Sequence, residues 1–220
     1  MVLGATLYGL IHQKYLPKQF ITLNGKYFEV VSIEKNAGVR LRRASDHIHG
    51  RLYYRQLKQF ELSSHKKALS SSPYRFNGIS ITTILKNIEV TTQGYYEMDS
   101  YNDLRNARLV EFSNIEPRYY REKRLLKIQF DQLDESVKIT LAALLNELFK
   151  TTYPDNYEYI NVACSMNEEQ QTALKGIVCG LKGDVEDDCI YIIEDSQLDL
   201  GMLVSVERNI PKSNWLSSMI

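Results

Sequence analysis

The chain has 220 residues, of which 44% are hydrophobic and 25% are charged, and its mean hydropathy is −0.32. This composition excludes a disordered, collagen-like or membrane-embedded protein. No segment reaches the ~18–20 apolar residues that a membrane span needs. The first lysine, Lys14, follows the apolar start instead of preceding it, so we expect no secretory signal, no membrane partner and a cytoplasmic location.

The formal net charge is zero, but the charges are unevenly distributed. Residues 1–130 contain 21 Lys and Arg against 11 Asp and Glu, a net charge of +10, whereas residues 131–220 contain 6 against 16, a net charge of −10. A summed charge of either sign selects partners through its field. The basic half is therefore suited to phosphates. The alternative interpretation is that the two halves attract each other or a neighbouring protein.

The basic half begins with a β-rich pattern. Residues 18–43 alternate apolar and polar side chains and are interrupted by two turn sequences, Asn24-Gly25 and Asn36-Ala37-Gly38. This pattern predicts three short antiparallel strands joined by tight hairpins. A fourth strand is predicted at residues 52–62, and we expect the four to form a small barrel or half-barrel.

A Ser-rich stretch at residues 63–78 predicts a linker or loop. β-branched and apolar runs at residues 79–96, 108–115 and 119–130 predict further strands.

From Ser136 the sequence takes a helical period. The predicted apolar stripe of this helix, which ends near Pro154, consists of Val137, Leu141, Leu144, Leu145 and Leu148. Strands are predicted at residues 157–165 and 189–193. A last helix is predicted at residues 198–209, capped by Asp195 or Ser196 and stopped by Pro211.

The predicted fold class is therefore α+β, with an N-terminal antiparallel β-rich, barrel-like module followed by a small α/β unit. We predict three segments: a basic β-barrel-like module at residues 1–65, a β-rich segment at residues 79–130, and an acidic α/β unit at residues 131–220.

Motifs for catalysis and cofactor binding are missing. The sequence has neither a GxxxxGK[ST] nor a GxGxxG loop. Cys164, Cys179 and Cys189 lack metal-ligand spacing, and the pair His47 and His49 lacks a third ligand. We therefore expect no catalytic residue, no metal and no cofactor, and a chain that is not an enzyme by itself.

One catalytic alternative concerns three carboxylates. Glu194, Asp195 and Asp199 follow a predicted strand, and carboxylates in such a place hold magnesium in nucleases. The lysine that usually accompanies them is not near in sequence, which favours helix capping over a nuclease site.

Two stretches resemble a known helicase family. The predicted order of helix, strand and strand, followed by residues 194–208, resembles the uncharacterised C-terminal domain of large DEAD/DEAH-box helicases of the MrfA type. Residues 20–43 and the Tyr-Tyr strand at residues 52–62 are similar to the small β-module that precedes that domain. The family's four-Cys zinc cluster and its two ATPase domains are absent from this sequence. The resemblance implies a piece of a longer helicase or a separate subunit beside a motor.

Arginines and tyrosines recur on the predicted strands of the basic half. If the strands at residues 38–43 and 52–62 are neighbours, their side chains form one Arg/Tyr surface, and residues 117–124 add a second basic-aromatic cluster. Guanidinium groups that pair with phosphates, together with aromatic rings that stack on bases, are typical of single-strand binding. The predicted nucleic-acid-binding residues are Arg40, Arg42, Arg43, Arg51, Tyr53, Arg55, Arg118 and Arg121.

The sequence thus predicts a non-catalytic accessory region or subunit of a DEAD/DEAH-like DNA helicase, which guides single-stranded or forked DNA along a basic β surface. The resemblance implies a role in DNA repair or antiphage defence, with helicase motor domains or another protein subunit as partner. The alternative is a protein-interaction subunit that does not contact nucleic acid.

Overall fold

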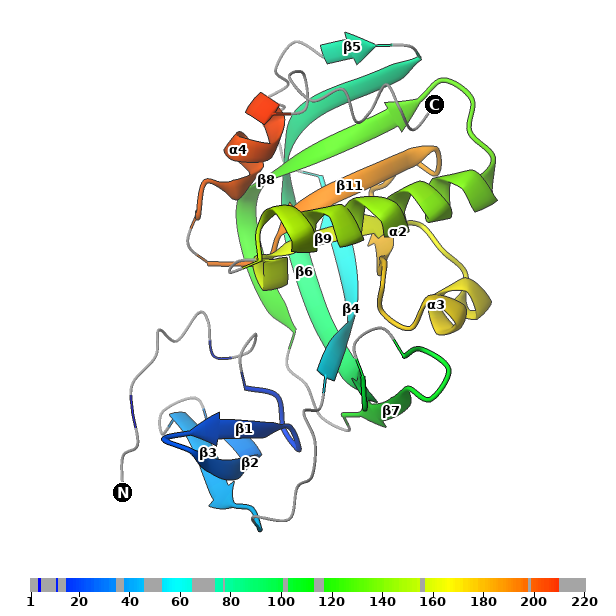
Figure 1. The fold of residues 1–220 in the computed structure, drawn as a ribbon. Coiled ribbons are helices and arrows are strands. Elements are labelled where there is room, and N and C mark those ends of the chain that lie inside the picture. The colour runs from blue at the N-terminus through cyan, green and yellow to red at the C-terminus, as the bar shows by residue number, and fades with distance from the viewer. Residues whose placement is uncertain are drawn as a thin grey trace.

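The structure is a computed structural model that describes residues 4, 11, 15–34, 38–45, 53–64, 74–76, 78–100, 103–112, 117–154, 157–197 and 199–209. Its strands form two sheets, one of three strands and one of eight (Figure 1). Helices pack on the larger sheet, so the predicted α+β class is confirmed. Among the described residues, no helix is long and apolar enough to cross a membrane.

The small sheet contains the three predicted N-terminal strands. Strands β1 (Phe20–Leu23), β2 (Lys26–Glu34) and β3 (Gly38–Arg43) pair antiparallel in the order β1-β2-β3. Asn24 and Gly25 join β1 to β2 with φ angles of 50° and 71°. Two successive positive φ angles match a tight hairpin turn, in which Asn-Gly is the preferred sequence. The three predicted strands and the Asn24-Gly25 turn are confirmed. Asn36 and Ala37 of the second predicted turn lie outside the described residues.

The large sheet closes on itself. Its pairings run β4-β10-β9-β11-β8-β6, and β6 also pairs with β4, so these six strands form a ring. The strands of the ring, here called the barrel, are β4 (Tyr53–Ser63), β6 (Ile79–Met98), β8 (Arg118–Phe130), β9 (Ile160–Cys164), β10 (Cys179–Gly183) and β11 (Cys189–Glu194). Two short strands, β5 (Tyr74–Phe76) and β7 (Arg108–Glu111), pair with β6 outside the ring.

The strand predicted at residues 52–62 exists as β4, but its predicted neighbours were wrong. Among the described residues β4 pairs with β6 and β10, and β3 pairs with β2. Alternation of apolar and polar side chains predicts a strand, but it does not identify the strand with which it pairs. The barrel therefore takes its strands from residues 53–194, and strands β1 to β3 form a sheet apart from it.

Three helices follow β8 in the described part of the chain: α2 (Glu135–Thr152), α3 (Glu168–Leu174) and α4 (Met202–Asn209). A short 3-10 helix, η1 (Tyr157–Tyr159), leads into β9. The carboxylate of Asp134 caps α2 by accepting a hydrogen bond from the backbone N–H of Ser136. Asn167 and Gln170 form a reciprocal capping box at the start of α3.

The predicted stripe of α2 was wrong at two of its five positions, because Val137 and Leu144 are exposed. Leu145 is buried, Leu141 packs against the core and Leu148 is half-buried. The fully buried face also carries Ala142, Phe149 and the lysine Lys138, whose ammonium donates to the backbone carbonyl of Asp187. A lysine can bury its aliphatic stem and keep its charged end bonded, which periodicity of apolar residues does not detect.

The start of α4 also differs from the prediction. The carboxylate of Glu194 accepts hydrogen bonds from the backbone N–H groups of Leu200 at 2.7 Å and Met202 at 3.3 Å. Asp199 accepts from Gly201 at 2.9 Å. Glu194 and Asp199 therefore cap α4, the role that was predicted for Asp195 or Ser196. The reason is that the helix begins four residues later than predicted.

Two apolar clusters make up the core. One lies inside the barrel and includes Phe60, Leu125, Tyr191 and Ile193. The other lies between the outer face of the barrel and helices α2 and α4. Successive apolar residues of β11 belong alternately to the inner and the outer cluster. All six residues of this strand are buried. A strand buried on both faces fixes the position of the residue that follows it, Asp195.

Candidate functional site

The arginines of β3 lie on an exposed strand. Arg40, Arg42 and Arg43 are all exposed. Arg42 donates two hydrogen bonds to the carboxylate of Glu29, which lies directly opposite on β2. An exposed ion pair of this kind contributes little stability and leaves the strand open to other ligands. The structure thus places three of the predicted binding residues on one strand, with Arg40 and Arg42 on one face and Arg43 on the other.

The remaining predicted residues are not all on this surface. Arg121 of β8 is exposed and follows Tyr119, whose side chain is 68% exposed. Tyr53 is half-buried, and Arg55 is buried with its guanidinium 3.5 Å from the carboxylate of Glu147 on α2. Arg118 points into the barrel. Arg51, like His47 and His49, lies outside the described residues.

A buried ionic cluster occupies one end of the barrel interior. The carboxylate of Asp195, which is fully buried, lies 2.8 Å from the ammonium of Lys58 and 2.8 Å from the guanidinium of Arg118. Tyr120 donates a hydrogen bond of 2.8 Å to the same carboxylate. Lys58 also donates to the side-chain oxygen of Asn161 at 3.2 Å. We call Asp195, Lys58, Arg118, Tyr120 and Asn161 the barrel-end cluster.

Opposing effects act on the ionisation of this cluster. Burial alone would raise the pKa of Asp195, but the charges of Lys58 and Arg118 outweigh it and hold that pKa well below the usual range of an aspartate. Burial and the neighbouring carboxylate raise the pKa of Tyr120. Asp195 therefore stays ionised with both oxygens occupied by donors, which leaves it no place as a magnesium ligand of the kind a nuclease uses.

A cavity of about 280 Å³ lies beside the barrel-end cluster. It is lined by β4, α2, η1 and the residues around the starts of β9 and β10. Its charged lining side chains are Arg55, Lys58, Lys150 and Glu158, and three tyrosines, Tyr53, Tyr54 and Tyr157, also line it. Cavities at the mouths of β-barrels are a common place for small ligands.

Sequence reasoning missed Lys58 and Lys150, although one signal for Lys58 was present. Lys58 shares the strand parity of Phe60 and Leu62, which both point into the barrel. A lysine in register with apolar residues marks a buried cation that needs a partner. The partner, Asp195, is 137 positions away in sequence, so only the fold identifies it.

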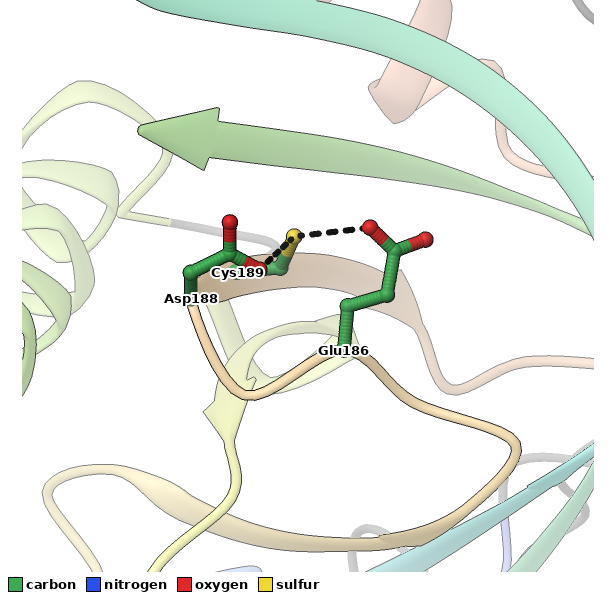
Figure 2. Close-up of side chains that lie close together, drawn as sticks. All are labelled: Glu186, Asp188 and Cys189. Carbon is green, nitrogen blue, oxygen red and sulfur yellow. Dashed lines mark hydrogen bonds between the residues drawn. The ribbon is translucent and has the colours of Figure 1, made fainter. Parts of the chain in front are cut away.

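A second group of polar side chains lies at the turn into β11. Figure 2 shows Glu186, Asp188 and Cys189 close together, with the Cys189 thiol donating to both carboxylates. Burial, followed by the nearby Asp188 charge, raises the pKa of Cys189 to about 12. Glu186 also accepts a hydrogen bond from Lys127. The Cys189 thiol and the two carboxylates thus form a hydrogen-bonded turn.

Ion pairs among the described residues join the basic half of the chain to the acidic half. Each links a cation from residues 1–130 to a carboxylate from residues 131–220. The pairs are Arg55–Glu147, Lys58–Asp195, Lys86–Asp184, Arg118–Asp195 and Lys127–Glu186. The attraction between halves that the sequence offered as an alternative is therefore present. The exposed arginines of β3 take no part in these pairs.

Comparisons with known proteins give one partial likeness. No family model matches the chain, and no curated protein matches it. Among solved structures, the crystal structure of the DUF1998 helicase MrfA bound to DNA is similar to this chain with a TM-score of 0.44 and 6% sequence identity. The match covers 89% of this chain and 24% of that chain. The chain thus spans about a quarter of that helicase, and its assignment to a C-terminal region stays a prediction.

Proposed function

We propose that this chain is a non-catalytic, nucleic-acid-binding accessory module, and that it works beside the motor domains of a DEAD/DEAH-like helicase. The helicase partner rests on the sequence resemblance. The observation that carries the nucleic-acid proposal is the exposed strand β3 with Arg40, Arg42 and Arg43. Cations on an exposed strand pair with successive phosphates without displacing any core contact.

The face of β8 extends this proposal. Arg121 and Arg124 are exposed, and Tyr119 presents a ring that is 68% exposed. An exposed aromatic ring beside cations is the combination that stacks on unpaired bases, at about 1–3 kcal/mol per base. We therefore favour single-stranded or forked DNA over duplex DNA as the ligand. DNA repair or antiphage defence as the setting rests on the sequence resemblance alone.

Charge reversal on β3 tests the proposal. In the double variant Arg40→Glu/Arg43→Glu we expect the affinity for a fluorescein-labelled single strand to fall at least about tenfold at low salt, because two phosphate contacts become repulsive. The variant leaves the Arg42–Glu29 pair intact. Fluorescence anisotropy measures the affinity.

The matched control is Lys182→Glu/Arg208→Glu, which reverses two exposed cations elsewhere on the chain. An equal loss of affinity in both double variants would show that only net charge matters and would contradict a site on β3. If the unaltered chain binds no DNA at low salt, the protein-interaction alternative takes its place.

A further inference from the structure

The cavity beside the barrel-end cluster has the chemistry of an anion site. Three of its four charged lining residues are cations: Arg55 and Lys58 from β4, and Lys150 from α2. All three side chains are at most 15% exposed. Buried cations gather in one place only where anions compensate them, and the strength of such contacts is raised by the low local dielectric.

Carboxylates outside the cavity lining pair with these cations. Glu147 lies 2.7 Å from the Lys150 ammonium and 3.5 Å from the Arg55 guanidinium. Asp195 lies 2.8 Å from the Lys58 ammonium. Within the lining itself, as far as the structure describes it, Glu158 is the only carboxylate beside the three cations. A ligand in the cavity therefore meets mainly positive charge.

Burial and a neighbouring cation both act on the ionisation of Lys150. Burial and the positive charge of Arg55 lower its pKa, against the opposing effect of Glu147. A bound anion next to Lys150 would restore the usual preference of its ammonium for the charged form. A negatively charged ligand in the cavity would therefore stabilise the charged form of Lys150.

The rest of the lining suits a ring with polar edges. Tyr53 and Tyr54 line the cavity from β4, and Tyr157 lines it with a side chain that is 39% exposed. The amide of Asn146, which also lines the cavity, provides a donor and an acceptor. The volume of about 280 Å³ is just below the ~300–1,000 Å³ of drug-sized ligand sites, which fits one small ligand and not a length of strand.

We propose that this cavity binds a single nucleotide with a terminal phosphate, its phosphate against Arg55, Lys58 and Lys150 and its base against the tyrosines. The nucleotide is either a free nucleoside monophosphate or the phosphorylated end of a single strand, since both present the same chemistry. The proposal goes beyond the β3 surface and does not depend on it.

Titration calorimetry with the intact chain tests this site with four probes: adenosine 5′-monophosphate, adenosine, a 5′-phosphorylated single strand, and the same strand without the phosphate. Binding of the monophosphate but not of adenosine supports the site and identifies a free nucleotide as sufficient. Binding of the phosphorylated strand alone supports it and identifies a strand end. A phosphate-independent response to all four probes, or no response to any, overturns it.

Two variants locate the binding. Lys150→Gln is expected to weaken monophosphate binding about tenfold or more, since it removes one charge-assisted contact. Lys182→Gln, an exposed lysine outside the cavity, should leave it unchanged. Thermal unfolding of both variants shows that they are folded. Equal binding by the two variants would overturn the assignment.

A second comparison separates this site from β3. Arg40→Glu/Arg43→Glu should keep its affinity for the monophosphate while it loses affinity for long strands. Amide chemical shifts of Gly176 and Cys179, which line the cavity, should move on monophosphate addition. If inorganic phosphate gives the same affinity as the monophosphate, the site is a general anion site and the proposal of a nucleotide fails.

Discussion

At the scale of single residues, Asp195 is the carboxylate that joins the two cations of the barrel-end cluster. Its carboxylate accepts from Lys58, Arg118 and Tyr120 and has no exposed surface. Breaking a buried ion pair by removing one partner leaves the other charge buried without compensation. Two cations depend on Asp195, so its loss affects both.

We therefore expect Asp195→Asn to lower the free energy of unfolding by about 3–5 kcal/mol. Urea denaturation followed by circular dichroism measures the change. Asp199→Asn serves as control, because Asp199 is exposed and its single contact, with the backbone of Gly201, is one that an asparagine oxygen also accepts. A similar, small effect of both substitutions would show that the barrel-end cluster is not a structural ion pair.

The cysteines give a second prediction at this scale. Burial raises the pKa of Cys164 to about 11, and the pKa values of Cys179 and Cys189 to about 12. The thiolate is the reactive form, and at pH 8 a thiol with a pKa of 12 is ionised in about one molecule in ten thousand. The native chain is expected to react very slowly with a disulfide reagent at pH 8.

Denaturation should release all three thiols to the same reagent, which provides the internal control. Rapid labelling of Cys189 in the native chain would contradict the buried, hydrogen-bonded turn of Figure 2. Zinc should not protect the native thiols from labelling at higher pH, since the turn supplies no ready thiolate ligand.

Residue-scale reasoning from sequence placed the exposed arginines of β3 on a strand correctly. It did not place Arg55 and Arg118, which are expected on a surface track from their strand pattern but lie against Glu147 and Asp195. Both carboxylates come from the acidic half of the chain. A guanidinium next to aromatic residues looks the same in sequence whether its partner is a phosphate or a distant carboxylate.

At the scale of elements, the sequence predicted which segments are strands better than it predicted how they pair. The three strands of residues 20–43 and their Asn-Gly turn follow from local signals. β4 was also found, but its partners β6 and β10 lie on later parts of the chain. Pairing over such separations depends on the packing of both barrel faces, which no local pattern contains.

The parallel contact between β10 and β4 gives a prediction about elements. Gly183 has φ +88° and lies opposite Leu62, and a Cβ at this position would overlap the Leu62 carbonyl oxygen. Gly38 has a similar φ of +84° but nothing near its Cβ position. At both positions a residue other than glycine would strain the backbone, but only at Gly183 would its Cβ also overlap a neighbouring atom.

Gly38→Ala should cost about 1–2 kcal/mol of unfolding free energy from the left-handed backbone alone. Gly183→Ala should cost about 1–3 kcal/mol more, because β10 must move away from β4. Chemical denaturation of both variants measures the difference. Equal costs would contradict the close approach of the two strands.

At the scale of the whole molecule, the barrel joins the two halves that differ in charge. β4, β6 and β8 come from the basic half, and β9, β10 and β11 come from the acidic half. Ion pairs within the described part of the chain cross between them, Lys58–Asp195 and Arg118–Asp195 among them. Part of the charge separation therefore stabilises the fold, and the segment boundaries at residues 65, 79 and 130 stay a prediction.

Three exposed arginines lie on β3, and the account depends on their use. The most direct measurement is the anisotropy of labelled single-stranded, forked and duplex DNA with the intact chain across a salt series. The account predicts that log affinity falls linearly with log salt by about 0.7 per phosphate contact on a single strand, and that Arg40→Glu/Arg43→Glu reduces this slope by about 1.4. No binding at low salt, or a slope unchanged by the double variant, would contradict a nucleic-acid surface on β3.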